Sequence, residues 1–339
     1  MSEEQDAKRP SGPATIYDIA KLAGVNPSTV SRALTTPGRI SAKTEAKIRA
    51  AAEELNYRVN PFARALPTGR TKLIAFTIAD ITNPVFFDLV RGAEQVAGEA
   101  GYTLVVAESQ ESSTKEASTL ARILPMVDGV VMGTTRLEDA EIAKVNSEKP
   151  VVLANRLVNG VADVVPNIEP GLHQAVAHLA DLGHKHIAYL SGPTSSWMNT
   201  RRWQVVMESA LKLGLTVVEI GPNSPTLATG AESLDRIRAA GVTAVITYND
   251  LMAIGLLRRA VEAGIRVPEQ LSIVGFDNSF GSDFTTPALT TVSQPLMELG
   301  ARAVTVLLDI LEERDSVAAL PELATSLLVR GSTAQAAKQ

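Results

Sequence analysis

Cysteine is absent from this chain of 339 residues, and aromatic side chains make up only 4% of it. Without cysteine there are no disulfides, no thiolate ligands for zinc and no cysteine nucleophiles. No apolar run reaches the roughly 18 residues of a membrane-spanning helix, so neither a transmembrane segment nor a membrane partner is expected. The first residues, MSEEQDAKRPSGP, lack the apolar stretch of a secretion signal. We therefore predict a disordered tail over residues 1–13 and a cytoplasmic protein.

The motifs of common catalytic sites are also absent. No glycine-rich phosphate loop follows a strand pattern, and no G-x-S-x-G elbow occurs. The four histidines are His173, His178, His184 and His186, and no cluster of further metal ligands accompanies them. We therefore predict no cofactor, no metal site and no catalytic residues, and we do not expect an enzyme.

Charge is unevenly distributed along the chain, whose formal net charge is −5. Residues 1–70 hold 11 Lys and Arg against 7 Asp and Glu, whereas the remainder holds 21 against 30. A small basic segment on an acidic body is typical of a domain that binds a polyanion such as DNA. Charge patterning alone is a weak signal, so the helical pattern of the same segment matters more.

The basic segment carries the pattern of three short helices. In TIYDIAKLAGVNPSTVSRAL (residues 15–34), Thr15 begins a capping-box variant, and Gly24 is suited to close the first helix in the left-handed conformation. An Asn-Pro pair starts the second helix, and Ser41 starts a third of about fifteen residues. Helices this short are stable only when packed together, which predicts a helix-turn-helix unit over residues 14–57.

From residue 72 onward, apolar runs of strand length alternate with amphipathic helices. The runs are LIAFTIA, YTLVVA, GVVMG, PVVLA, HIAYLSG, TAVITY and LSIVGFD, and helical patterns cover residues 86–100, 170–182, 200–213, 249–263 and 295–312. This alternation predicts parallel sheets built from βαβ units. The runs are too many for one sheet with short connections, so we expect two sheets side by side. A ligand cleft is expected at the carboxyl ends of their strands.

The second helix offers side chains suited to reading DNA. The candidate contacts are Pro27, Ser28, Thr29, Ser31 and Arg32 on its outer surface, together with Thr15 and Tyr17 at the start of the first helix. An arginine in the major groove can donate two hydrogen bonds to guanine, worth roughly 1–3 kcal/mol of discrimination. The alternative is an ordinary helical hairpin without a nucleic-acid partner.

Half of the aromatic side chains fall at or beside predicted strand ends or the helix starts that follow them. They are Phe86, Phe87, Trp197, Trp203, Tyr248, Phe276 and Phe280. Aromatic faces stack on sugars or bases, and a few polar groups then fix the orientation of the ligand. Core packing is the alternative role, above all for Trp203 and Phe276.

The segment TIYDIAKLAGVNPSTVSRAL matches, almost throughout, the DNA-binding signature of the LacI/GalR (lactose-repressor) family of bacterial transcription regulators. Similar family segments follow in the same order: LNYRVNPFARAL (55–66), SGP (191–193), NDLMAIG (249–255), VGFDN (274–278) and TTVSQP (290–295). The resemblance covers about residues 14–331. It implies an N-terminal all-α helix-turn-helix head and an α/β core of two doubly wound parallel-sheet subdomains, similar to type I periplasmic binding proteins.

The resemblance also implies how DNA is bound. Family members bind near-palindromic operators as two-fold dimers, with the second helix in the major groove and hinge helices in the minor groove. Leu66 matches the leucine that wedges into the central base step there, and Asn60 and Arg64 are further hinge candidates. An apolar wedge costs a few kcal/mol of unstacking and gains contact surface. Pro67 departs from the family pattern and is expected to shorten or end the hinge helix.

A second implied site is the effector cleft. The resemblance places Asn83, Phe87, Asn155, Arg156, Arg202, Asn249 and Asp277 around a small effector, and the aromatic group adds Phe86, Trp197 and Tyr248. Arg202 and Asp277 are the foremost candidates because a planar donor fork and a carboxylate acceptor suit vicinal hydroxyls. A structural ion pair is the alternative. Val205 and Pro166 replace a usual glycine and a usual aspartate, so they bear on the effector class, which we expect to be a sugar, a polyol or a nucleoside.

These patterns together suggest domain limits. We expect a hinge over residues 58–70, a core over 71–331 and a tail over 332–339. Within the core, the N-subdomain is expected to span 71–164 and 293–325, and the C-subdomain 165–292 and 326–331. The tail has no leucine heptads, so the helical tetramer extension of some family members is not expected, and a homodimer is.

The function that fits best is a sequence-specific DNA-binding regulator, expected to be a repressor, whose operator affinity an effector controls. Effector binding is expected to tilt the two subdomains and so to respace the hinges. Two other classes remain open. The first is a solute-binding protein of sugar transport, which the extra head and the missing secretion signal oppose. The second is an α/β enzyme acting on a sugar, which the missing catalytic motifs oppose.

Overall fold

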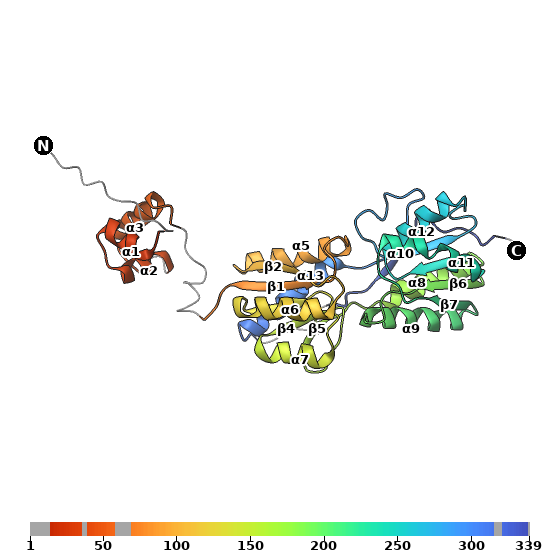
Figure 1. Ribbon diagram of the computed structural model, residues 1–339, viewed down its shortest axis with the longest axis horizontal. Coiled ribbons are helices and arrows are strands. Elements are labelled where there is room, and N and C mark those ends of the chain that lie inside the picture. Colours follow the sequence, from red (N-terminus) through yellow and green to blue (C-terminus); the bar gives the residue numbers. More distant parts are fainter. Residues whose placement is uncertain (1–13, 36–38, 58–68, 315–320, 338–339) are drawn as a thin grey trace. The chain divides into compact units, whose positions relative to one another are not determined.

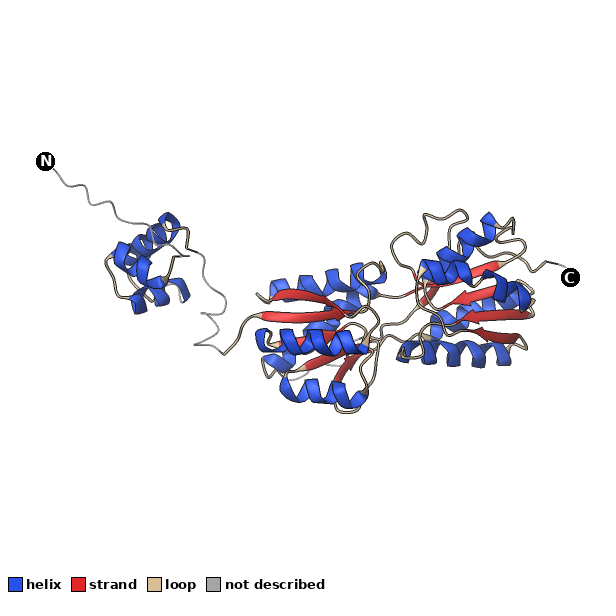
Figure 2. Ribbon diagram, in the orientation of Figure 1, coloured by secondary structure: helices blue, strands red, loops and turns tan. Residues whose placement is uncertain are grey.

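The computed structural model describes residues 14–35, 39–57, 69–314 and 321–337. The chain forms two compact units, which divide between Lys72 and Leu73 (Figure 1). The regular elements among the described residues of the first unit are helices, and the second unit combines helices with strands (Figure 2).

The described part of the first unit, called the head below, contains three short helices. They are α1 (Ile16–Ala23), α2 (Pro27–Thr35) and α3 (Ala42–Glu54). Each helix contributes buried apolar side chains to one small core: Ile19 and Ala20 from α1, Val30 and Ala33 from α2, and Ile48 and Ala51 from α3. The predicted helix-turn-helix is therefore confirmed, and its stability comes from this shared core rather than from any helix alone.

The ends of the head helices follow their residue types. Gly24 closes α1 with φ +65°, the left-handed conformation that glycine adopts without steric cost. At the start of α1, the Asp18 carboxylate accepts hydrogen bonds from the Thr15 backbone N–H at 2.8 Å and from the Thr15 hydroxyl at 2.7 Å. These bonds hold the pKa of Asp18 below its usual value. Ser41 caps α3 by accepting from the Thr44 N–H at 3.3 Å.

The second unit, the core, holds two separate sheets. The first sheet is parallel throughout, in the order β2-β1-β3-β4-β5. Its strands are β1 (Leu73–Ile78), β2 (Thr103–Glu108), β3 (Gly129–Met132), β4 (Val151–Ala154) and β5 (Ala162–Val164). Its helices are α5 (Val85–Glu99), α6 (Ser113–Ile123), η1 (Leu124–Met126), α7 (Asp139–Glu148) and α13 (Leu296–Leu311). We call these elements the N-lobe.

Helices cover both faces of the N-lobe sheet because successive strand residues point in opposite directions. Phe76 and Val131 pack under α5 and α13, whereas Met132 and Val130 pack with α6 and α7. Helices α5 and α13 approach each other closely through glycines. A Cβ on Gly92 would lie 1.9 Å from the Met297 carbonyl oxygen, so only glycine fits there.

The second sheet has the order β11-β10-β9-β8-β6-β7. Its strands are β6 (His186–Leu190), β7 (Thr216–Ile220), β8 (Ala244–Thr247), β9 (Ser272–Asp277), β10 (Thr290–Ser293) and β11 (Ser326–Leu328). Its helices are α8 (Glu169–Asp181), α9 (Trp197–Lys212), α10 (Leu227–Glu232), α11 (Leu234–Ala239) and α12 (Asp250–Glu262). We call these elements the C-lobe.

One strand departs from the predicted parallel arrangement. β11 pairs antiparallel with β10, from Thr291–Leu328 to Ser293–Ser326. The strand lies at the sheet edge, where the returning chain can add three residues in either direction, and antiparallel edges are common on otherwise parallel sheets. The remaining C-lobe strands are parallel, and all seven runs predicted as strands form strands.

The lobes are connected by three neighbouring chain segments. The chain passes between β5 and α8, between β10 and α13, and from α13 back to β11. Two of these segments are bonded together: the Asn167 N–H donates to the Leu323 carbonyl at 2.9 Å, and the Thr325 N–H donates to the Asn167 carbonyl at 3.0 Å. Leu323 packs in the N-lobe core, and the Thr325 hydroxyl accepts from the Gly171 N–H in α8 at 3.2 Å.

Candidate functional site

The outer face of α2 is polar and accessible. Ser28 and Arg32 are exposed, and Pro27, Thr29 and Ser31 are half-buried. Val30 and Ala33 lie on the opposite face, fully inside the head core. The packing of the head therefore fixes α2 and leaves a guanidinium and hydroxyls outward, as reading a DNA groove requires.

Further candidate contacts surround this face or fall outside the described residues. Tyr17 is 69% exposed, and the hydroxyl of exposed Thr15 already donates to Asp18. Lys21, Arg39 and Lys43 add exposed positive charges to the head. The predicted hinge residues Asn60, Arg64 and Leu66, together with Pro67, lie outside the described residues.

A pocket lies between the two lobes of the core, where strands of both sheets end. Nine of the ten predicted effector residues line it: Asn83, Phe86, Asn155, Arg156, Trp197, Arg202, Tyr248, Asn249 and Asp277. Gln294 and Leu296, at the crossover between β10 and α13, also line it. Side chains from both lobes and from the segment that connects them therefore face one space.

Phe87 is the exception among the predicted residues. Its ring is 47% exposed and lies 6.3 Å from the ring of Phe280, in a separate recess between α5 and the loop after β9. Phe87 leaves α5 in a direction about 100° from that of Phe86. In this structure it therefore faces this recess and is not among the residues that line the pocket.

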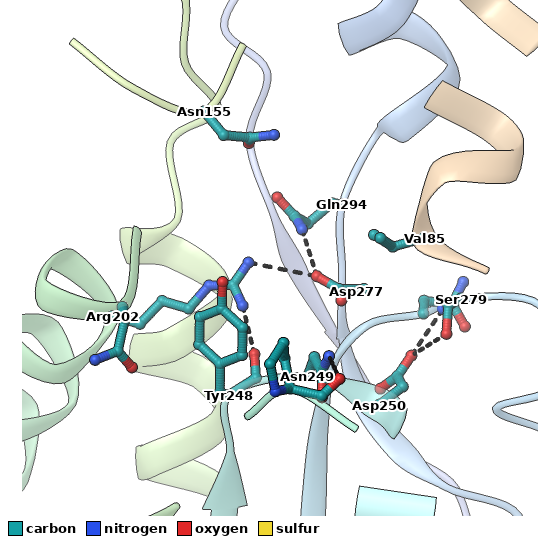
Figure 3. A network of polar contacts seen from close by, with 12 residues as sticks. Val85, Asn155, Arg202, Tyr248, Asn249, Asp250, Asp277, Ser279 and Gln294 are labelled. Atoms are coloured by element: carbon teal, nitrogen blue, oxygen red, sulfur yellow. Dashed lines mark hydrogen bonds and ion pairs between the residues drawn. The ribbon is translucent and has the colours of Figure 1, made fainter. Parts of the chain in front are cut away.

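Arg202 belongs to a network of polar contacts that includes Tyr248, Asp277 and Gln294 (Figure 3). Its guanidinium donates to the Tyr248 carbonyl and, at 3.4 Å, to Asp277 Oδ1. It also lies over the Phe276 ring, with its central carbon 3.6 Å from the ring centroid. Gln294 Nε2 donates to the same Asp277 oxygen at 2.7 Å. The residues of this network are buried, so their geometry is fixed before any ligand enters.

A second buried carboxyl lies behind Asp277. Asp250 accepts from the Thr291 hydroxyl at 2.6 Å, from the Ser279 N–H at 2.7 Å and from the Ser279 hydroxyl at 3.2 Å. These bonds hold the end of β9 and the turn that follows it. Asp277, the last residue of β9, has the rare φ of +113°. Burial raises the pKa of Asp277, although Arg202 opposes the rise. Burial and the nearby Asp277 charge raise the pKa of Asp250.

Several buried polar atoms around the pocket have no hydrogen-bond partner among the described residues. They are the acceptors Asn155 Oδ1 and Gln294 Oε1, the donors Arg156 Nε and Arg202 Nε, and the Thr134 hydroxyl. Buried polar groups are nearly always satisfied in folded proteins, so these five atoms are available to bond a ligand in the pocket. Both donors and acceptors are present, which suits hydroxyl groups.

The aromatic residues take different roles. Phe86, Trp197 and Tyr248 line the pocket. Trp203 instead stacks on Tyr189 with ring centroids 5.8 Å apart, and Phe276 lies fully buried beneath Arg202. Core packing is therefore the observed role of Trp203.

The N-lobe adds two charged residues to the pocket that were not predicted from the sequence. Arg136, in the loop after β3, and Glu111, in the loop after β2, both line it. Arg136 Nε donates to Glu111 Oε2 at 2.7 Å. Arg136 follows the carboxyl end of a strand, as the predicted site residues do, and this position was the available signal for it.

The two departures from the family pattern lie beside the pocket rather than in it. Val205, on α9, is buried in the C-lobe core, to which α8 also contributes. Pro166 lines a neighbouring recess together with Trp197 and Met198. Neither residue is among those that line the pocket, although the recess beside Pro166 shares Trp197 and Met198 with it.

Other kinds of site find no support in the described part of the chain. No group of three or more His, Asp or Glu side chains there is placed to hold a metal ion. His184 packs against the C-terminal segment, bonded to the Thr243 hydroxyl at 2.7 Å and to the Ala334 carbonyl at 3.2 Å. No helix among the same residues is long and apolar enough to cross a membrane.

Comparisons with known proteins match both units. Residues 15–60 match the family described as bacterial regulatory proteins, lacI family, and residues 176–333 match the periplasmic binding protein-like domain. The HTH-type transcriptional repressor CytR of Escherichia coli K12 is 31% identical over 342 residues, covering 96% of this chain and 98% of the relative. The repressor PurR of Pasteurella multocida is 32% identical over 330 residues, covering 94% and 98%.

Solved structures agree with these sequence relatives. The lac repressor dimer bound to operator and the anti-inducer ONPF superposes with a TM-score of 0.84 at 27% identity, over 95% of this chain and 100% of that one. A LacI family transcriptional regulator from Mycobacterium smegmatis gives a TM-score of 0.69 at 30% identity, over 77% and 99%.

Proposed function

This chain belongs to the LacI family of bacterial regulatory proteins and is a DNA-binding transcription regulator rather than an enzyme, and from that premise we propose how it works. It acts in the cytoplasm as a homodimer that represses transcription from a palindromic operator. A small ligand in the interlobe pocket, a sugar, a polyol or a nucleoside, sets the affinity for DNA.

One observation carries the proposal above the others. The pocket is lined by both lobes and by the crossover residues Gln294 and Leu296, and its uncommitted polar atoms come from both lobes as well. A ligand held there touches each side of the connection between the lobes, so it favours one lobe arrangement over another. The ligand can change the free energy of operator binding only by as much as its own binding free energy differs between those arrangements.

The head supports the DNA half of the proposal. Arg32 projects from the exposed face of α2, where it would read guanine, with Ser28 and Ser31 beside it. Tyr17 and Thr15 would contact the phosphate backbone from α1, and Asn60, Arg64 and Leu66 would complete the contacts in the minor groove.

Selection of DNA from a random duplex library tests this proposal. We expect the full chain to select a sequence with two-fold symmetry. Arg32→Ala removes one bidentate base contact from each subunit, and each is worth about 1–3 kcal/mol, so the variant dimer should bind the selected duplex at least roughly 30-fold more weakly. Arg49→Ala is the matched control, because Arg49 is exposed on α3 and paired with Glu45.

The selection and the two variants together either support or contradict the role of α2. Selection of a symmetric duplex, with a loss confined to Arg32→Ala, supports α2 as the reader. The proposal is wrong if no sequence is enriched, or if Arg32→Ala and Arg49→Ala bind the selected duplex as tightly as the unchanged chain.

A further inference from the structure

The pocket contains two arginine–carboxylate pairs, one from each lobe. The C-lobe supplies Arg202 and Asp277, whose atoms approach to 3.4 Å. The N-lobe supplies Arg136 and Glu111, whose atoms approach to 2.7 Å. All four residues line the same pocket, so a ligand there meets a donor beside an acceptor on both walls.

Arg136 is held in place from several sides. Its side chain is only 6% exposed, and its guanidinium also donates to the Thr135 carbonyl at 3.3 Å. Its backbone N–H donates to Glu116 Oε2 at 2.9 Å, and Glu116 is itself buried at the start of α6. An arginine fixed in this way loses little conformational entropy when it binds a ligand, which is the arrangement expected of a recognition residue.

The charges around the pocket are balanced. Three arginines line it, and each already has a carboxylate partner: Arg136 with Glu111, Arg156 with Asp139, and Arg202 with Asp277. Glu116 adds a further buried carboxyl next to Arg136. A phosphate or carboxylate ligand would place its negative charge beside the Glu111 and Asp277 carboxyls that line the pocket, and this like-charge repulsion is a cost to its binding.

Hydroxyl groups avoid that cost because each can donate to a carboxylate and accept from a guanidinium. Two adjacent hydroxyls can therefore bridge an arginine–carboxylate pair without disturbing it. We propose that Arg136 and Glu111 form a second hydroxyl-binding pair, and that the ligand is an uncharged compound with hydroxyl groups at two sides, one set read by each lobe. This deepens the proposed function and rests on its claim that the pocket binds the effector.

Thermal unfolding of the full chain, without DNA, tests the ligand class. The probes are D-ribose, D-xylose, D-glucose, sorbitol, adenosine and uridine, each compared with its phosphate monoester. We expect at least one neutral compound to raise the Tm and its ester not to. An ester that stabilises more than its parent would overturn the proposal, and so would a panel in which no neutral compound stabilises.

Variants test the residues with the stabilising compound. Arg136→Gln should weaken its binding at least tenfold, and Arg201→Gln should leave binding unchanged, because Arg201 pairs with Glu169 outside this pocket. A deoxy analogue that lacks the hydroxyl read by Arg136 should bind the unchanged chain more weakly than the parent compound does. To Arg136→Gln, the analogue and the parent compound should bind with equal affinity. A general loss of structure would not remove that difference.

The double variant Glu111→Gln/Arg136→Gln replaces the pair by neutral amides and keeps the test valid if the single variant unfolds. Binding by either variant at the affinity of the unchanged chain would refute the role of the pair. Because no DNA is present, these assays measure ligand binding alone, and their results do not depend on whether the head recognises an operator.

Discussion

Asp250 shows how a single residue below the pocket shapes it. The residue is fully buried, and its two carboxylate oxygens hold Ser279 and Thr291, which brace the left-handed turn after Asp277. Gly275 makes room for it, since a Cβ there would lie 2.2 Å from Asp250 Oδ1. The position of the ligand-facing carboxylate therefore depends on a residue that does not itself line the pocket.

The raised pKa of Asp250 predicts a pH-dependent stability. Burial and Asp277 raise the pKa in the folded protein, so the folded protein keeps a proton that the unfolded chain has released. Unfolding then releases that proton, and rising pH destabilises the fold from about pH 4 to about pH 7. Asp250→Asn does not titrate, so the Tm of Asp250→Asn minus that of the unchanged chain should increase across this window.

Thermal unfolding at half-unit pH steps measures this difference. The comparison uses the change in the difference with pH, so a constant offset from the altered hydrogen bonds does not affect it. A difference that stays level or falls between pH 4 and 7 would contradict the assignment.

At the residue scale, the sequence predicted nine of the residues that line the pocket, but it did not predict the arginine–carboxylate pair of the N-lobe. Strand ends and family segments identified nine lining residues, including Arg202 and Asp277. Phe87 lies instead in the recess beside Phe280, and the sequence does not reveal which of two neighbouring helix residues faces a pocket. Arg136 and Glu111 were missed because their pairing joins loops 25 residues apart, and only the folded sheet brings these loops together.

At the scale of elements, the close contact of α5 with α13 depends on glycine. Gly92 on α5 meets the Met297 backbone, and Gly300 on α13 meets the Leu89 backbone, where a Cβ would lie 1.8 Å from the carbonyl oxygen. Each helix therefore presents a glycine to the backbone of the other. Both helices also pack on the N-lobe sheet, so their spacing sets the geometry of that lobe.

Two glycine substitutions on α5 should have opposite effects. Gly92→Ala forces the helices apart and should destabilise the fold by about 1–3 kcal/mol or more. Gly98→Ala places its Cβ in open space, 3.8 Å from the Glu94 side chain, and should stabilise by about 0.5–1 kcal/mol because alanine favours the helix. Urea unfolding measures both. Equal effects of the two changes would rule out the close helix contact.

The sequence predicted apolar strands better than strands with polar or exposed residues. All three head helices and seven strands were found from caps and apolar runs. The strands β5, β7, β10 and β11 were not, because they carry polar or partly exposed residues, whereas the predicted strands β3, β4 and β8, of only four residues each, are fully buried. Their place in the sheets is decided by tertiary pairing, which outweighs local preference in such short segments.

For the whole molecule, the division between Lys72 and Leu73 separates the head, proposed to bind DNA, from the core, proposed to bind the ligand. We predict that a chain of residues 73–339 folds, binds the stabilising compound with a dissociation constant within about twofold of that of the full chain, and does not bind the selected duplex. Calorimetric titration and a gel-shift assay measure the two properties. Operator binding by the shortened chain would contradict the division, as would loss of ligand binding in a folded core.

The discontinuous N-lobe has a consequence for protein synthesis. Its five strands are complete at Val164, yet Leu299, Ala303 and Leu307 of α13, which fill its core, are translated only after the whole C-lobe sheet except β11. At about 5–20 residues per second, the apolar face that α13 covers stays open on the ribosome for on the order of ten seconds. The nascent N-lobe thus presents an apolar sheet face to chaperones while the C-lobe is being made.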